Sequence, residues 1–396
     1  MKRILFVDDE IAVLEGLRDR LRKQRREWDM VFALGGAAGI AECEHAAFDV
    51  VVTDMRMPGV DGATLLRHVK ETHPETIRIV LSGHAEREAV LRALPVAHQF
   101  LGKPCDAEAL RDVITRACAL QTMMTDGALQ RIIGRVEKLP SLSTTYVALT
   151  DVLARDAPSI DDVVGVVEQD PAMCLKLLQL VNSAFFGLPR RVSAMREAIT
   201  YLGIDLVKSL VLGAQIFAAA EAMDASGGSL ATMQRHSVLV ARVARAISPS
   251  QGGSDAFMAG MLHDVGRIVL KLADPAAFAS VTAAALERAV PSYVVERERL
   301  GVTHAEAGAY ILGSWGVPLA IVEAVAGHHE PQRVGSCSFD ATTAVHVAES
   351  LVTESEGDEA PADAPVDRAH IEKLGLLGKL PEWQDAARRT RDEGGG

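Results

Sequence analysis

The fold is decided by the stretch VVVTDMRMPG (residues 50–59), in which the strand-like run Val50–Thr53 leads directly into the carboxylate of Asp54. A short, continuous apolar run is typical of a strand that is buried on both faces of a sheet. In open parallel sheets, chemistry lies at the carboxyl ends of the strands. The stretch therefore predicts a buried strand with a functional carboxylate at its end.

The same pattern continues on both sides of this stretch. Short β-rich runs lie at Ile4–Val7, Met30–Ala33, Val50–Thr53, Ile77–Leu81 and His98–Leu101. Helical patterns lie at Ala12–Arg25, Ala37–His45, Thr64–Thr72, Glu86–Leu94 and Ala107–Leu120. Five such units predict an α/β doubly wound, five-stranded parallel sheet that is covered by helices on both faces.

Polar side chains lie where four of these strands end. Asp8 and Asp9 follow the first strand, Asp54 ends the third, Ser82 ends the fourth and Lys103 follows the fifth. Three carboxylates on one rim make an oxygen-rich site that suits Mg²⁺. A hydroxyl and a lysine opposite them can hold phosphoryl oxygens, and a carboxylate can itself accept a phosphoryl group covalently.

Together these residues resemble the receiver domain of a bacterial response regulator. The matching motifs are Val7-Asp8-Asp9-Glu10, Asp54-Met55-Arg56-Met57-Pro58-Gly59, Ser82-Gly83 and Lys103-Pro104, and the resemblance covers about 120 residues. It implies that Asp54 is the phosphate acceptor and that a sensor histidine kinase or a small phosphodonor supplies the phosphoryl group. It also implies that Mg²⁺ is bound directly by Asp9, Asp54 and the backbone carbonyl of Arg56, with Asp8 acting through water.

The resemblance assigns roles to the opposite side of the site as well. Lys103 and Ser82 would contact the phosphoryl group, and Ser82 and Phe100 would form a switch pair that reorients on phosphorylation. The Lys103–Pro104 bond is expected to be cis, as in the family. A homodimer that forms through this domain is a further expectation.

The character of the sequence changes after Leu120, because strand patterns stop and helical periodicity runs from Leu139 to about Leu351. We therefore predict four segments: residues 1–121 as the α/β domain, 122–136 as a helical linker, 137–352 as an all-α domain, and 353–396 as an acidic, Pro/Ala-rich and partly flexible tail.

The helical region carries a second series of motifs. They are Gln169-Asp170-Pro171, the run from Leu177 to Ala184, the run from Ala198 to Gly203, and Leu262-His263-Asp264-Val265-Gly266. This series resembles the HDOD domain, a helical relative of the HD phosphohydrolases. The resemblance implies a regulatory or scaffolding module that binds a protein partner.

The HD enzymes hold metal ions with histidines and carboxylates, and this chain keeps much of such a set. The candidate ligands are His236, His263, Asp264, His304, His328, His329 and Glu349, a mixture that suits Fe, Mn or Zn. The alternative function is therefore a metal-dependent phosphohydrolase that acts on a nucleotide or cyclic dinucleotide. Three departures weaken it: Arg267 follows Gly266, the GYP signature of one enzyme group is absent, and the late carboxylate is Glu349 instead of Asp.

Composition limits the remaining possibilities. The formal charge of −12 argues against broad electrostatic binding to nucleic acid, and no DNA-binding motif is present. The apolar run from Leu206 to Met223 is interrupted by charged and amide side chains, so no membrane insertion is expected and the location is expected to be cytoplasmic. The scattered histidines, among them His98 and His370, are expected at the surface.

Overall fold

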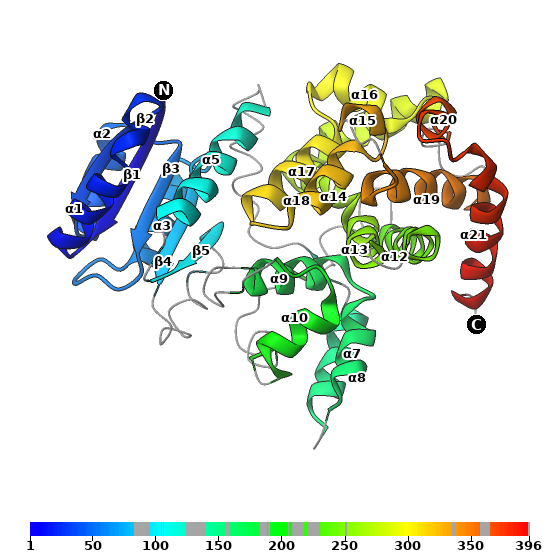
Figure 1. The fold of residues 1–396 in the computed structure, drawn as a ribbon, viewed down its shortest axis with the longest axis horizontal. Helices are drawn as coiled ribbons and strands as arrows, with labels where there is room; N and C mark the ends of the chain where they lie inside the picture. The colour runs from blue at the N-terminus through cyan, green and yellow to red at the C-terminus, as the bar shows by residue number, and fades with distance from the viewer. Residues whose placement is uncertain are drawn as a thin grey trace. The chain divides into compact units, whose positions relative to one another are not determined.

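The computed structural model describes the chain except for residues 83–92, 94–95, 104, 106, 124–139, 142, 156–157, 183–187, 189–190, 205, 208–217, 220–229, 250–251, 335–337, 357–364 and 395–396. The chain forms two compact units (Figure 1). The first comprises Met1–Lys138, Gln179–Arg191 and Gly313–Gly316, and the second comprises Leu139–Leu178, Val192–Leu312 and Val317–Gly396.

A five-stranded parallel sheet forms the centre of the first unit. Its strands are β1 (Lys2–Asp8), β2 (Trp28–Leu34), β3 (Val50–Asp54), β4 (Ile77–Ser82) and β5 (Gln99–Gly102), in the order β2-β1-β3-β4-β5. The predicted α/β doubly wound fold is thus confirmed. Because the order reverses between β1 and β3, their carboxyl ends border the crevice in which such sheets bind ligands.

The helices around this sheet are α1 (Ile11–Arg20), the 3-10 helix η1 (Arg22–Arg26), α2 (Gly36–His45), α3 (Gly62–Thr72) and α5 (Ala107–Met123). The single helix predicted for Ala12–Arg25 is wrong, since α1 ends at Arg20 and the chain continues as η1. The residues of η1 are basic or polar and none of them is buried, so neighbouring like charges oppose a longer helix there. The helix predicted at Glu86–Leu94 lies outside the described residues, apart from Ala93.

Apolar side chains from the strands and helices form the core of this unit. Phe6, Val52 and Ile79 of the sheet pack with Leu14 of α1 and Leu110 of α5, and all of them are buried. This packing fixes the strands against each other and therefore sets where their polar ends lie.

Arg78 of β4 is buried within the same unit, where it is only 2% exposed. Its guanidinium group donates to the carbonyl oxygens of Pro74 at 3.0 Å, Thr76 at 2.9 Å and Val96 at 2.6 Å. It also lies against His98, whose ring Nε2 is 2.8 Å away. His98 is itself buried, so its expected surface position is wrong; its ring packs against this buried cation.

The second unit is helical, apart from one short pair of strands. Its helices are α7 (Ser143–Leu153), α8 (Ile160–Val167), α9 (Pro171–Val181, whose last three residues belong to the first unit), α10 (Met195–Leu202), α12 (Leu230–Ile247), α13 (Gly253–Leu262), α14 (Val265–Ala273), α15 (Pro275–Arg288), α16 (Ser292–Leu300), α17 (His304–Ser314, whose last two residues belong to the first unit), α18 (Leu319–Gly327), α19 (Ala341–Glu356), α20 (Arg368–Lys373) and α21 (Leu380–Gly394). The 3-10 helices η5 (Pro331–Arg333) and η6 (Leu377–Lys379) complete them, with one two-residue parallel pair, β6 (Pro140–Ser141) and β7 (Ala218–Ala219). α12 packs against α13, α19 and α21, and α13 packs against α18 and α19.

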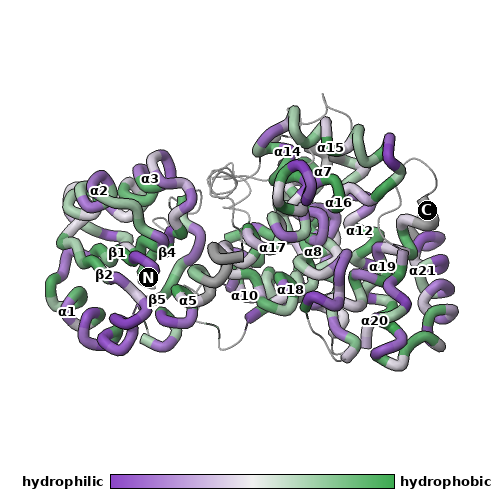
Figure 2. The backbone as a smooth tube through the Cα atoms, turned by 90° about the horizontal axis from the view of Figure 1, so that it is seen from above, coloured by the Kyte–Doolittle hydropathy of each residue, from purple (hydrophilic) through white to green (hydrophobic). Residues whose placement is uncertain are grey.

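The C-terminal residues differ from the predicted tail. α19 continues through Glu356, so the predicted boundary at residue 352 falls inside a helix, and α21 packs against α12 and α19. Ile371 and Trp383 are buried, as is His370, whose expected surface position is wrong. Hydrophilic and hydrophobic positions alternate along α21 (Figure 2), which gives this helix an apolar face to bury.

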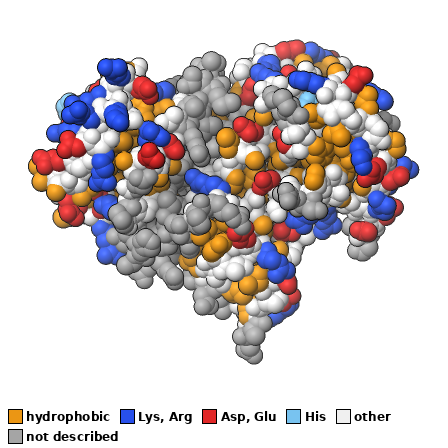
Figure 3. Space-filling view, viewed as in Figure 1, with side chains coloured by type: hydrophobic (Ala, Val, Ile, Leu, Met, Phe, Trp, Pro, Cys, Tyr) orange, Lys and Arg blue, Asp and Glu red, His pale blue; other side chains and the backbone are white. Residues whose placement is uncertain are grey.

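The described surface carries both signs of charge. Acidic and basic side chains are interspersed on the face shown in Figure 3. Within the described ranges, no helix has both the length and the apolar content needed to cross a membrane.

We predict that Arg78→Lys lowers the free energy of unfolding of the first unit by roughly 2–4 kcal/mol, because a single ammonium group cannot replace a planar fork that reaches three carbonyl groups. Urea unfolding of the full chain measures the effect, and Arg67→Lys, at an exposed position of α3, is the matched control. Equal losses in the two variants would contradict the role of Arg78.

Candidate functional site

Carboxylates and one lysine meet at the carboxyl edge of the sheet. Asp8 ends β1, Asp54 ends β3, and Lys103 directly follows β5. The ammonium nitrogen of Lys103 lies 2.9 Å from Asp8 Oδ2 and also pairs with Asp54 Oδ1. Asp8 and Asp54 are buried, at 1% and 7% exposure, whereas Asp9 is exposed. The site is therefore open on the side where Asp9 lies.

The backbone around Asp54 is fixed by close packing. Asp54 Oδ2 accepts a hydrogen bond from the Arg56 amide at 2.8 Å, and Gly62 N donates to Met55 O at 3.1 Å. A Cβ atom on Gly62 would lie 2.2 Å from the carbonyl oxygen of Asp54, so only glycine allows α3 to approach this closely. Arg56 is thereby held beside Asp54.

The charges at this edge do not balance. Burial raises the pKa of the Asp54 carboxyl, and the hydrogen bond from Lys103 opposes that shift only in part. Burial disfavours the charged form of Lys103, but its bonds to Asp54 and Asp8 outweigh burial and raise its pKa. Asp8 and Asp54 both contact the ammonium group of Lys103, and Asp9 adds a third carboxylate next to Asp8 in the chain, so acidic groups outnumber the one ammonium group and fit a divalent cation.

The remaining residues predicted for this site lie on adjacent strands. Ser82 and Phe100 are each 1% exposed, on the paired strands β4 and β5. Pro104, and with it the expected cis bond, lies outside the described residues. The structure thus brings together Asp8, Asp54 and Lys103, with Ser82 at the end of the neighbouring strand.

All seven predicted metal-ligand residues of the second unit lie in one cluster. His236 lies on α12, His263 follows α13, Asp264 precedes α14, His304 begins α17, His328 and His329 follow α18, and Glu349 lies on α19. In each of two trios, His304/His328/His329 and His236/His263/Asp264, the candidate ligand atoms lie within 4.8 Å of one another.

Short distances join these groups. Glu349 Oε2 lies 2.9 Å from Nε2 of His236 and 3.1 Å from Nε2 of His263. His304 Nε2 lies 3.3 Å from Asp264 Oδ1 and 2.8 Å from His329 Nε2. Glu349 therefore links α12 to the residue after α13, despite being longer than the Asp of the enzymes.

The outer nitrogens of three imidazoles are fixed by acceptors. His263 Nδ1 lies 2.7 Å from Gly260 O, His328 Nδ1 lies 2.7 Å from Val325 O, and His304 Nδ1 lies 2.8 Å from a Glu296 oxygen. Carbonyl and carboxylate oxygens only accept hydrogen bonds, so each Nδ1 carries the proton in the neutral ring. Each Nε2 then presents a lone pair to the cluster, as in imidazoles that ligate metals.

These inward lone pairs are buried. His263, His304 and His328 are each 0% exposed, and His328 Nε2 has no hydrogen-bond partner among the described residues. Two imidazole nitrogens facing each other at 2.8 Å need a proton or a metal ion between them. The donor set of imidazoles and carboxylates fits Fe, Mn or Zn.

Burial and neighbouring charges determine the protonation of the cluster. Burial lowers the pKa of His328 to about 3 and that of His329 well below its usual value, and neighbouring imidazoles reinforce both shifts. Burial opposes the charged form of His263, but Asp264 and Glu349 raise its pKa. For Glu349, burial is outweighed by His236 and His263, which hold its pKa well below its usual range.

Sequence reasoning missed three residues that position the ligands. Glu296 is 1% exposed on α16 and also accepts from the backbone N–H of His304 at 2.7 Å. Its position in a run of charged residues gives no sign of burial. Arg267, noted only as a departure, lies with Nε 3.0 Å from Asp264 Oδ1 and donates to Ser292 at 3.0 Å.

The third missed residue is His346, one helical turn before Glu349 on α19. Its Nδ1 lies 2.7 Å from the carbonyl oxygen of His328, and its Nε2 accepts from the backbone N–H of Asp367 at 2.8 Å. Asp367 also pairs with Gln332, which follows the His328-His329 pair. His346 precedes Glu349 by three residues, so the sequence could have indicated that the two side chains share one face of a helix.

Comparisons with known proteins match both units. The response regulator receiver domain model matches residues 4–115, and the HDOD domain model matches residues 139–331. The chain is 26% identical to an uncharacterized protein of Treponema pallidum (strain Nichols) over 220 residues. This aligned region covers 55% of this chain and 43% of that protein. Over 126 residues, it is 29% identical to the hydrogenase transcriptional regulatory protein HoxA of Bradyrhizobium diazoefficiens, covering 31% of this chain and 25% of that protein.

The chain therefore spans less than half the length of these curated relatives. Among solved structures, it is similar to the MmoQ response regulator of Methylococcus capsulatus str. Bath, with 22% identity and a TM-score of 0.47. That likeness covers 62% of this chain and 98% of the other.

Acidification is expected to destabilise the chelator-treated protein. His328 has a pKa of about 3 when folded, against about 6.5 when unfolded, so its contribution to stability is full above about pH 6.5 and is lost as the pH falls toward 3. The pKa values of His329 and His346 are also lowered, so these residues act in the same direction. The pKa of His263 is raised, so this residue acts in the opposite direction. Urea unfolding between pH 8 and pH 4 measures how the free energy of unfolding depends on pH. In the His328→Asn variant this dependence should be shallower. An unchanged dependence would show that protonation of His328 does not cause the loss of stability.

Proposed function

We propose that the chain, in which a receiver domain model and an HDOD domain model both match, is a two-component response regulator, and that phosphorylation of Asp54 controls the HDOD domain as a regulatory binding module. The observation that carries this proposal is the cluster of Asp8, Asp54 and Lys103 at the sheet edge. It combines a nucleophilic carboxylate with a cation that can hold phosphoryl oxygens.

In this proposal a carboxylate oxygen of Asp54 attacks the phosphorus atom of a phosphohistidine on a sensor histidine kinase, or of a small phosphodonor. The new P–O bond forms as the bond to the donor breaks. Asp9, Asp54 and the carbonyl of Arg56 would hold Mg²⁺ directly, with Asp8 acting through water. When bound, Mg²⁺ neutralises charge on the phosphoryl oxygens.

Lys103 connects the reaction to the switch. Its ammonium group contacts both Asp8 and Asp54, and a phosphoryl group on Asp54 offers it new acceptors. Ser82 ends the strand beside β3, close to the same edge. We propose that Ser82 turns toward the phosphoryl oxygens and that Phe100 on β5 moves with it, which alters the surface that a partner contacts.

We expect Asp54→Asn to abolish the phosphoryl label acquired from acetyl phosphate and Mg²⁺, because the amide lacks the nucleophilic oxygen. Gel electrophoresis that retards phosphoproteins measures the label. Asp61→Asn is the matched control, since Asp61 caps α3 near the site and Asn also caps helices. Equal labelling of Asp54→Asn and wild type would show that the acceptor lies elsewhere.

For the HDOD domain we propose that the histidine cluster holds Fe, Mn or Zn as a structural link between α12, α13, α17 and α19. The support is the fixed Nδ1 atoms and the burial of His263, His304 and His328. A hydrolase needs substrate access to a metal-bound water, whereas a closed set of ligands is typical of structural sites. This burial favours the binding module over the phosphohydrolase.

The partners in this proposal follow from the two domains. A sensor histidine kinase would phosphorylate the receiver, and a second copy of the chain could pair through the receiver. The HDOD domain would bind a protein partner. Direct binding to DNA is not part of the proposal.

We predict that protein purified without chelators carries near-stoichiometric Fe, Mn or Zn, and that His263→Ala/Asp264→Ala carries none. Elemental analysis by mass spectrometry measures this. His370→Ala is the control, because His370 is buried but bonds Thr343, outside the cluster. His346→Phe should weaken metal binding roughly 10–100-fold through loss of its support for His328. Wild-type protein that is folded and free of metal would refute the structural metal.

A further inference from the structure

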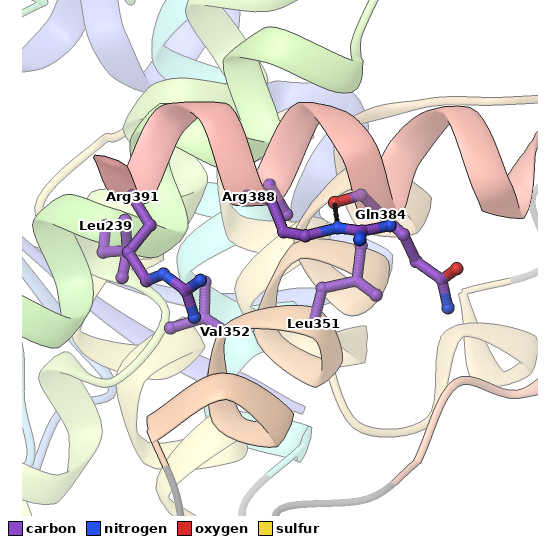
Figure 4. A pocket seen from close by; sticks show the side chains of 7 residues that line it. Leu239, Leu351, Val352, Gln384, Arg388 and Arg391 are labelled. Carbon is purple, nitrogen blue, oxygen red and sulfur yellow. Dashed lines mark hydrogen bonds between the residues drawn. The ribbon is translucent and has the colours of Figure 1, made fainter. Parts of the chain in front are cut away.

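A cavity of about 260 Å³ lies between α12, α19 and α21 in the second unit. It is lined by Leu239, Leu351, Val352, Gln384, Ala387, Arg388 and Arg391. Figure 4 shows Arg388 and Arg391 reaching from α21 toward Leu351 and Val352. The candidate sites described above include none of these residues.

The two sides of the cavity differ in chemistry. α12 and α19 contribute the aliphatic side chains of Leu239, Leu351 and Val352, while α21 contributes two arginines three residues apart, on one helix face. The arginine side chains are 65% and 46% exposed, so their stems can cover apolar surface while their charges remain in water.

The nearby acids leave part of both guanidinium groups available. Arg388 donates to Asp385 Oδ1 at 2.8 Å and to the carbonyl of Gln384 at 3.4 Å. Arg391 Nε lies 3.8 Å from Asp392 Oδ1, beyond hydrogen-bond distance. Each guanidinium group has five N–H donors, so among the described residues' contacts donors remain on both side chains for an anion. Of the two guanidinium groups, that of Arg391 has the longer contact with an Asp side chain.

We propose that this cavity binds a single-chain amphipathic anion, with its aliphatic chain on Leu239, Leu351 and Val352 and its phosphate or carboxylate on Arg391 and Arg388. Planar guanidinium groups recognise both kinds of oxyanion through paired hydrogen bonds. The volume is close to the lower end of ligand sites, about 300 Å³, so it admits one short chain and not a helix or a lipid bilayer.

The location gives such a ligand a route to the rest of the domain. Leu239 follows His236 by three residues on α12, and Val352 follows Glu349 by three residues on α19. The cavity therefore lies one helical turn from the contact between His236 and Glu349. The proposal does not depend on whether that contact holds a metal.

Isothermal titration calorimetry of the full chain tests the site with octyl phosphate and octanoate, both below their micellar concentrations. Octanol, octyltrimethylammonium and inorganic phosphate are the matched probes that lack the anion, reverse the charge or lack the chain. We expect both octyl anions to bind, octanol to bind at least about tenfold more weakly, and the other two not to bind measurably.

Variants on α21 locate the binding. Arg388→Gln/Arg391→Gln should weaken octyl phosphate binding about tenfold or more, while Arg389→Gln, on the same helix but outside the cavity, should leave it unchanged. Equal affinity for octanol and octyl phosphate would overturn the anion assignment. Unchanged binding in the double variant would overturn the location, and binding of anionic vesicles without binding of octyl phosphate would overturn the ligand class.

Discussion

A buried cluster of electron-pair donors is stable only when protons or cations lie among them, and both units of this chain are arranged around such a cluster. In the receiver the donors are the carboxylates of Asp8 and Asp54, and Lys103 supplies a cation from the chain itself. In the HDOD domain the donors are imidazole nitrogens and the carboxylates of Asp264 and Glu349. Arg267 pairs with Asp264 in this second cluster, whose other donors are imidazoles and Glu349.

The positions of these donors depend on backbone contacts that leave no room for side chains. Gly62 lets α3 approach Asp54, and a Cβ on Gly266 would lie 1.8 Å from the carbonyl oxygen of His304. Hydrogen bonds then set each ring: Glu296 fixes His304, and His346 holds the His328 carbonyl. Through Asp367, His346 also joins residues after the acidic stretch to the cluster, so the C-terminal helices are part of the domain's structure.

The sequence predicts those parts of the fold and of the site that depend on patterns within short segments of the chain. The five strands were predicted to within about two residues, because buried parallel strands are short apolar runs with polar ends. The seven residues of the histidine cluster were predicted from motif order. Glu296 could not be, since it lies among exposed charges and its burial arises only when α16 meets the start of α17. The burial of His98 and His370 likewise depends on partners distant in sequence, Arg78 and Thr343.

The two clusters also differ in what can change them. Asp9 is exposed to solvent next to Asp8, and in the proposed reaction a phosphoryl group on Asp54 alters the balance of charge around Lys103. The imidazoles of the HDOD cluster are buried, and three of them have their outer nitrogens fixed. Their Nδ1 atoms bond to Gly260 of α13, Val325 of α18 and Glu296 of α16, so the positions of these rings are coupled to those three helices. Movement of a helix would therefore change the cluster, as the proposed signal transmission by this domain requires.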